Sequence, residues 1–85
     1  MTIEIYTTAI CPYCAQAKNL LKQKGVTYEE IQVDKEADRL SEAVERSGGR
    51  MTVPQIFIDN RHVGGYDELY ALEQTGALDE MLGRR

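Results

Sequence analysis

Hydrophobic and polar residues alternate along this chain with a period that changes from two to three or four. Ile3 and Ile5 alternate with more polar residues over residues 2–6, which predicts a first strand. From Pro12 onward, apolar residues recur every three or four positions, as on the buried face of a helix. Proline suits the first turn of a helix because its missing N–H would have no partner there, and we expect Gly25 to cap the C-terminal end.

The middle of the chain predicts a second strand and a second helix. Residues 26–33 are rich in side chains that favour strands. The apolar phase slips midway along this segment, which indicates either a β-bulge or a strand that is buried on both faces. A helix is expected to follow, to end at Gly48 and Gly49, and to bury a face that carries Ala37, Leu40 and Val44.

The last third of the chain predicts a β-hairpin and a final helical segment. The two short apolar strands of the hairpin are expected at residues 55–58 and 61–63, and the tight turn that joins them at residues 59–60. The helix that follows buries one face, which carries Tyr66, Leu69 and Leu72. Gly76 interrupts this helix, and residues 77–82 form a last short helical turn.

These segments give the order β-α-β-α-β-β-α within one domain that spans residues 1–85. The first β-α-β unit should be parallel with a right-handed crossover, and the hairpin must be antiparallel. The predicted fold class is therefore α/β, with a four-stranded mixed sheet and helices on both of its faces.

Composition and charge narrow the possible functions. The net charge of −4 argues against nucleic acid as a partner, and no apolar run is long enough to cross a membrane. Met1 leads directly into the first strand, so no secretory signal is expected. Two cysteines are too few for a disulfide framework. We therefore expect a cytoplasmic protein whose cysteine pair is catalytic or binds a metal.

The cysteine pair lies in the sequence Cys-Pro-Tyr-Cys, where the first strand meets the first helix. Cys11 is predicted at the helix cap and Cys14 at the third helical position, on the same face, so the two sulfur atoms can form a disulfide. Unpaired N–H groups and the helix dipole stabilise a thiolate at this position. We expect Cys11 to be the exposed nucleophile and Cys14 to be the resolving thiol.

Two other interpretations of the pair carry less weight. A structural zinc site needs two further ligands, and only His62 remains as a candidate. An inert pair of thiols is also possible. A C-x-x-C sequence beside a β-α-β pattern is typical of a thioredoxin-like redox motif, which is the interpretation that we adopt.

Four segments together resemble the glutaredoxin family. Residues 11–14 resemble the active-site motif of dithiol glutaredoxins, and residues 52–54 resemble the loop that holds the family's cis-proline. Residues 64–67 resemble its glutathione-binding glycine–glycine–x–aspartate segment, and residues 69–72 with Gly76 resemble its closing helix. The resemblance covers nearly the whole chain and implies a thioredoxin-like α/β sandwich.

The resemblance also implies a glutathione site beside Cys11, formed by Tyr13, Thr52, Val53, Pro54, Gly65, Tyr66 and Asp67. A cis bond before Pro54 would turn the Val53 backbone toward the cysteine of glutathione. The N–H groups of Tyr66 and Asp67 would face the γ-glutamyl carboxylate, and the Asp67 carboxylate would meet its ammonium group. The alternatives are that Asp67 caps a helix, that the glycines only end a strand, and that Tyr13 is merely exposed.

The motifs above assign no role to three arginines and one histidine. Arg39, Arg46 and Arg50 are expected to be mainly solvated, although one of them could meet the glycine carboxylate of glutathione. His62 is expected on the surface of a strand.

The activity implied by the resemblance is glutathione-dependent thiol–disulfide exchange on protein disulfides and glutathione mixed disulfides. Glutathione would be the reductant, with no resident metal, and we expect a monomer. One rival is a redoxin that is reduced by thioredoxin reductase, which residues 65–67 disfavour. Another is an iron–sulfur carrier of two chains and two glutathiones, which Pro12 disfavours by stiffening the loop. The protein substrate is not identified by the sequence.

Thr8 departs from the family pattern, because many glutaredoxins carry a lysine three residues before the first cysteine. We therefore predict that Thr8→Lys lowers the pKa of the Cys11 thiol, since a nearby positive charge favours the thiolate. The measurement is the pH dependence of Cys11 alkylation in a Cys14→Ser background, with and without the lysine. Superimposable titration curves would show that position 8 does not tune the nucleophile.

Overall fold

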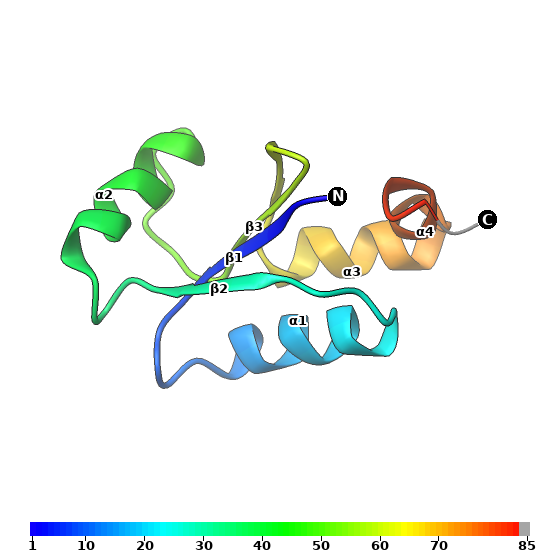
Figure 1. The fold of residues 1–85 in the computed structure, drawn as a ribbon, viewed down its shortest axis with the longest axis horizontal. Helices are drawn as coiled ribbons and strands as arrows, with labels where there is room; N and C mark the ends of the chain where they lie inside the picture. The colour runs from blue at the N-terminus through cyan, green and yellow to red at the C-terminus, as the bar shows by residue number, and fades with distance from the viewer. Residues whose placement is uncertain (84–85) are drawn as a thin grey trace.

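The computed structural model describes residues 1–83, which form four strands and four helices (Figure 1). In chain order these are β1 (Ile3–Thr7), α1 (Pro12–Gln23), β2 (Glu29–Gln32), α2 (Ala37–Arg46), β3 (Gln55–Ile58), β4 (Arg61–Gly64), α3 (Tyr66–Thr75) and α4 (Ala77–Met81). Among these helices, none is both long enough and apolar enough to span a membrane.

The strands form one mixed sheet in the order β2-β1-β3-β4. β1 and β2 are parallel, whereas β1 pairs with β3, and β3 with β4, in antiparallel register. The parallel pairing of β1 with β2 and the antiparallel pairing of β3 with β4 were predicted from the order of the elements and are confirmed. Asp59 and Asn60 have positive φ angles, as a two-residue turn that matches the twist of a hairpin requires.

Helices cover both faces of the sheet, as predicted (Figure 1). On one face, Ile5 of β1 and Ile56 of β3 pack against Leu21 of α1 and Leu69 of α3. Alternate residues of the same strands point to the opposite face, where a smaller cluster packs under α2 and contains Tyr6, Ile31, Val33, Ala43 and Phe57. The predicted α/β sandwich is confirmed.

The extent of the second strand was predicted wrongly. β2 covers only Glu29–Gln32, and Glu29 and Glu30 are exposed, so it is a short edge strand rather than one buried on both faces. The irregular register lies elsewhere, in the pairing of β3 with β4 beside Ile56 and Phe57. The phase slip falls where a loop over residues 26–28 ends and β2 begins, and Val26 of this loop packs against the core.

The start of the first strand and the end of the first helix each differ by one residue from the prediction. β1 begins at Ile3, and the cap of α1 is Lys24. Gly25 follows the cap with a φ of 71°, and its N–H bonds the carbonyl of Lys22. The glycine therefore still ends the helix, as a left-handed residue just beyond the cap.

The buried face of α2 was also predicted wrongly. Ala37 and Leu40 are exposed and Val44 is only partly covered, while Ala43 is buried against the sheet. Arg46 lies on this inner face with about a quarter of its side chain exposed, so it is not the solvated residue that the sequence predicted. The helix docks through charged side chains as well as apolar ones.

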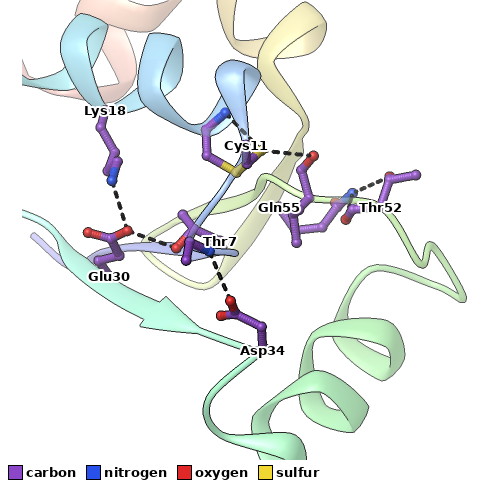
Figure 2. Close-up of a disulfide and its surroundings, with 10 residues drawn as sticks. Thr7, Cys11, Lys18, Glu30, Asp34, Thr52 and Gln55 are labelled. Carbon is purple, nitrogen blue, oxygen red and sulfur yellow. Dashed lines mark hydrogen bonds and ion pairs between the residues drawn. A yellow bond between two sulfur atoms is a disulfide. The ribbon is translucent and has the colours of Figure 1, made fainter.

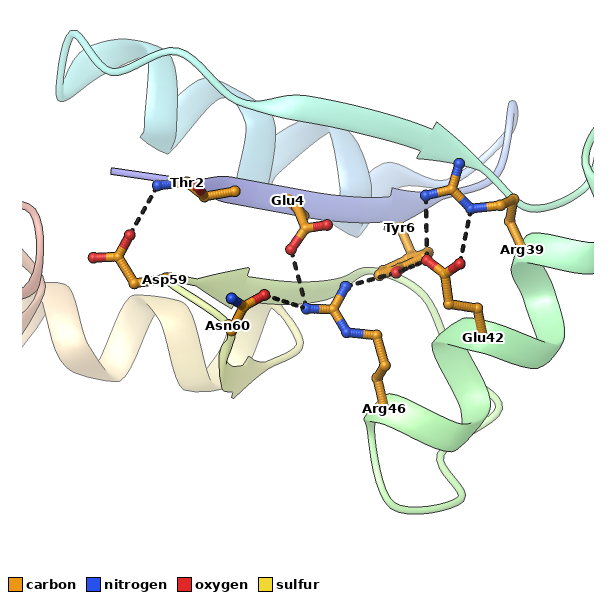
Figure 3. A network of polar contacts seen from close by, with 8 residues as sticks. All are labelled: Thr2, Glu4, Tyr6, Arg39, Glu42, Arg46, Asp59 and Asn60. Carbon is orange, nitrogen blue, oxygen red and sulfur yellow. Dashed lines mark hydrogen bonds and ion pairs between the residues drawn. The ribbon is translucent and has the colours of Figure 1, made fainter.

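Arg46 is the centre of a polar network that ties α2 to the sheet (Figure 3). Its guanidinium lies 3.0 Å from the Glu4 carboxylate and donates to the Tyr6 hydroxyl at 2.7 Å. The same group sits 3.9 Å from the centre of the Phe57 ring, a cation–π contact. The Tyr6 hydroxyl donates to Glu42, and burial together with this bond raises the pKa of Tyr6.

We predict that Arg46→Met destabilises the protein by about 2 kcal/mol, because it leaves the Glu4 carboxylate and the Tyr6 hydroxyl short of a partner. The measurement is urea-induced unfolding. Arg39→Met is the matched control, because Arg39 pairs with Glu42 within the same helix and is more exposed. Equal losses in the two variants would contradict a central role for Arg46.

Candidate active site

Cys11 and Cys14 are joined by a disulfide at the N-terminus of α1, with their Cα atoms 5.2 Å apart (Figure 2). Cys11 is the N-cap residue, and its sulfur accepts a hydrogen bond of 3.1 Å from the N–H of Cys14. Cys11 is partly exposed, whereas Cys14 is only 1% exposed. The structure therefore places both cysteines at the helix positions that the sequence predicted, with Cys11 partly exposed and Cys14 buried in the first turn.

Polar contacts fix the backbone that leads into α1 (Figure 2). The N–H of Ala9 donates to Asp34 at 3.0 Å. Glu30 of β2 accepts bonds of 2.8 Å from the buried Thr7 hydroxyl and 2.9 Å from the ammonium group of Lys18 on α1. Burial alone would raise the pKa of Glu30, but the two bonds lower it. These contacts depend on how α1 lies across the sheet, so no local sequence pattern could predict them.

The loop before β3 lies beside the disulfide. The Val53–Pro54 peptide bond is cis, as the resemblance implied, and the Val53 carbonyl oxygen lies 3.8 Å from Cys11 Sγ. The Gln55 side-chain amide donates to both the carbonyl and the hydroxyl of Thr52, which holds the loop (Figure 2). His62 lies exposed on β4, as predicted, 2.7 Å from the Gln55 amide oxygen.

Glu68 organises the N-terminus of α3. Its carboxylate accepts the N–H of Gly65, the cap residue, and pairs with Arg50 at 3.3 Å. The Gly65 bond chiefly lowers the pKa of Glu68. A Cβ atom at Gly64, where φ is +121°, would lie 2.5 Å from the same carboxylate, so a larger residue would displace it.

Glu68 therefore makes the helix-cap contact that the sequence analysis considered for Asp67. Within residues 1–83, the Asp67 carboxylate, which is exposed, forms no hydrogen bond or ion pair. The role of Glu68 was not predicted from the sequence. Its position three residues after the cap glycine is the spacing of a capping box, and this spacing was the signal that could have identified it.

A groove of about 280 Å³ connects these elements. All seven residues that the resemblance assigned to glutathione line it, together with Arg50 and Glu68. The Tyr13 ring stacks on that of Tyr66, with centroids 6.3 Å apart. Arg39 and Arg46 do not line the groove. Arg39 pairs with Glu42 on α2, and Arg46 pairs with Glu4 of β1.

A comparison with protein families matches residues 3–63 to the family described as Glutaredoxin. This chain belongs to the glutaredoxin family. It is 58% identical over 82 residues to glutaredoxin 1 of Rickettsia typhi, a match that covers 95% of this chain and 79% of that protein. It is 54% identical over 80 residues to glutaredoxin 3 of Escherichia coli K12, covering 94% of this chain and 95% of that one.

Solved glutaredoxin structures share the fold. The solution structure of glutaredoxin from Brucella melitensis has a TM-score of 0.84 and 51% identity, covering 96% of this chain and 88% of that one. A buckwheat glutaredoxin crystallised as a glutathione complex has a TM-score of 0.87 and 31% identity. The match covers 95% of this chain and 76% of that one. These matches support the thioredoxin-like sandwich expected from the sequence.

Membership of the family implies thiol–disulfide oxidoreductase activity, and the Cys11–Cys14 pair of this glutaredoxin supplies the dithiol. The exposed sulfur at a helix N-terminus suits the attacking thiolate, since the backbone N–H of Cys14 already points at it. Over residues 1–83, no group of three or more His, Cys, Asp or Glu side chains is arranged to hold a metal ion.

Proposed function

We propose that this glutaredoxin uses glutathione to reduce protein disulfides and glutathione mixed disulfides, with Cys11 as nucleophile and Cys14 as resolving thiol. The observation that carries the proposal is the groove that joins Val53, whose carbonyl oxygen lies 3.8 Å from Cys11 Sγ, to the N-terminus of α3. It combines a thiol at one helix N-terminus with a second helix N-terminus that suits an anion.

The electron balance follows ordinary thiol–disulfide exchange. With a glutathione mixed disulfide, the Cys11 thiolate attacks the glutathione sulfur, and the client leaves as a thiolate that takes up a proton. A second glutathione thiolate then attacks the adduct, so glutathione disulfide forms and Cys11 is released.

With a protein disulfide, Cys11 first forms a mixed disulfide with the client. Cys14 then attacks Cys11 Sγ and expels the client thiol, which leaves the Cys11–Cys14 disulfide. Two glutathiones reduce this disulfide and leave as glutathione disulfide. Because Cys11 and Cys14 lie three residues apart on one chain, the second step is intramolecular and therefore fast.

Glutathione has matching partners in the groove. The cysteinyl backbone would pair with the Val53 backbone, and the γ-glutamyl carboxylate would accept from the N–H groups of Tyr66 and Asp67 at the start of α3. The free carboxylate of Asp67 would take the ammonium group. Of the three arginines, Arg50 alone lines the groove, where it pairs with Glu68 at the N-terminus of α3.

The proposed compartment and the proposed partners follow from the chemistry. A disulfide that glutathione must reduce needs a reducing compartment, so we propose the cytoplasm, with disulfide-containing or glutathionylated proteins as clients. A single chain contains every residue assigned to the site, which fits a monomer of one domain over residues 1–85. Neither nucleic acid nor a membrane is needed as a partner.

The test of this function is the reduction of a small glutathione mixed disulfide, coupled either to glutathione with glutathione reductase or to thioredoxin reductase. We expect turnover only in the first assay, because only glutathione uses the groove. Efficient turnover with thioredoxin reductase alone would replace this proposal with the redoxin rival.

We predict that Cys11→Ser abolishes both activities, whereas Cys14→Ser keeps reduction of glutathione mixed disulfides and loses reduction of protein disulfides. The first reaction needs one thiol and the second needs a resolving thiol. The measurement is the rate with each class of substrate. Equal loss of both activities in Cys14→Ser would disprove this division of roles.

We predict that Asp67→Ala weakens binding of glutathione about tenfold, the effect of losing one charge-assisted contact. The free energy of unfolding should change by less than about 0.5 kcal/mol, because the carboxylate has no partner within residues 1–83. Asp38→Ala, on the exposed first turn of α2, is the matched control. Unchanged binding with lower stability would leave Asp67 a structural role only.

A further inference from the structure

A chain of hydrogen bonds runs from the surface of β4 to the loop that lines the groove. His62 Nε2 lies 2.7 Å from the side-chain oxygen of Gln55. The side-chain nitrogen of Gln55 donates to the carbonyl and the hydroxyl of Thr52, at 3.1 and 3.2 Å (Figure 2). Thr52 lines the groove, whereas His62 and Gln55 do not. The chain therefore connects a residue outside the groove to the loop beside Cys11.

The register of the sheet brings these residues together. His62 pairs with Phe57 across the β3–β4 hairpin, so both side chains lie on one face, and the centroids of their rings are 5.0 Å apart. Gln55 lies two residues before Phe57 on β3 and projects to the same face. Gln55 is only 1% exposed, so its amide needs partners within the protein, and His62 and Thr52 supply them.

The direction of each hydrogen bond in this chain follows from the chemistry of its members. A carbonyl oxygen only accepts, so the end of the Gln55 amide that faces the Thr52 carbonyl must be its nitrogen. The other end is then the oxygen, and His62 must donate to it from Nε2. If the amide turned over, its oxygen would face the Thr52 carbonyl, and two acceptors would oppose each other. His62 therefore holds the amide in the orientation that Thr52 requires.

The same reasoning sets the polarity of the Thr52 hydroxyl. Its oxygen accepts from Gln55, so its own proton is available to a different acceptor. Thr52 is exposed and lines the groove, where an oxygen of a ligand can be that acceptor. The bond to the Thr52 carbonyl fixes the peptide that leads into Val53. A loop that is already ordered binds a ligand more tightly, because less entropy is lost on binding.

We propose that His62 is a positioning residue for the glutathione groove. Through the buried Gln55 amide it holds residues 52–54 in the conformation that receives the ligand, and it leaves the Thr52 hydroxyl as a donor to an oxygen of glutathione. This inference rests on the proposed function and adds to it two residues, His62 and Gln55, that act on the ligand only through Thr52.

The experiment compares the reduced wild-type protein with His62→Phe, His62→Gln, Gln55→Met and the double variant His62→Phe/Gln55→Met. Phenylalanine keeps a ring against Phe57 and removes the donor, whereas the glutamine side chain can place an N–H donor where Nε2 lies. Methionine keeps the length of the Gln55 side chain without its amide. The probe is S-methylglutathione, which cannot exchange with Cys11. Its dissociation constant is measured by NMR titration, and urea-induced unfolding gives the stability of each variant.

We expect His62→Phe and Gln55→Met each to raise the dissociation constant of S-methylglutathione about fivefold, the effect of losing one hydrogen bond. His62→Gln should restore most of the binding, because it restores the donor. His62→Phe should have no further effect in the Gln55→Met background, since the histidine acts only through Gln55. Arg61→Lys, at the exposed neighbouring residue of β4, is the control and should bind like the wild type.

Two results would overturn this role of His62. One is an unchanged dissociation constant in His62→Phe, even if that variant is less stable. The other is equal weakening in His62→Phe and His62→Gln, because packing and not donation would then explain the loss. If Gln55→Met does not fold, the two His62 variants decide the matter alone. Failure of the wild type to bind S-methylglutathione would instead contradict the proposed function.

Discussion

The site depends on one local interaction, the hydrogen bond from the N–H of Cys14 to the sulfur of Cys11. It exists because Cys11 caps α1 and so faces the unpaired N–H groups of the first turn. The cap position follows from the β-α-β unit, in which a short loop joins β1 to α1. Contacts of Thr7, Ala9 and Lys18 with β2 and the following loop fix this junction (Figure 2).

A second helix N-terminus completes the arrangement. β3 and β4 form a tight antiparallel hairpin. The loop before β3 and the start of α3 after β4 therefore lie at the same end of these two strands. Val53 is thereby placed beside Cys11, and Asp67 lines the same groove as Val53. The fold thus brings the Cys11–Cys14 pair and the N-terminus of α3 to one groove of about 280 Å³.

Local signals were enough to predict much of this molecule. The turn at Asp59 and Asn60, the cap at Cys11 and the cis bond before Pro54 each depend on a few neighbouring residues. The inner face of α2 could not be predicted in this way. Arg46 contacts Glu4 (Figure 3) and the Phe57 ring only once α2 lies on the sheet. A prediction from hydrophobic periodicity places charged residues on the exposed face of a helix. Glu68 was missed for a different reason: the capping contact was considered for Asp67 instead, and Arg50 lies 18 residues away in the sequence.

The central claim is that two helix N-termini share one glutathione. It is tested most directly by NMR on Cys14→Ser after Cys11 has been converted to the mixed disulfide with glutathione. The account predicts nuclear Overhauser contacts from the γ-glutamyl group to the amide protons of Tyr66 and Asp67. Contacts of that group only with the hollow between α1 and α3, lined by Gln16 and Tyr70, would contradict it.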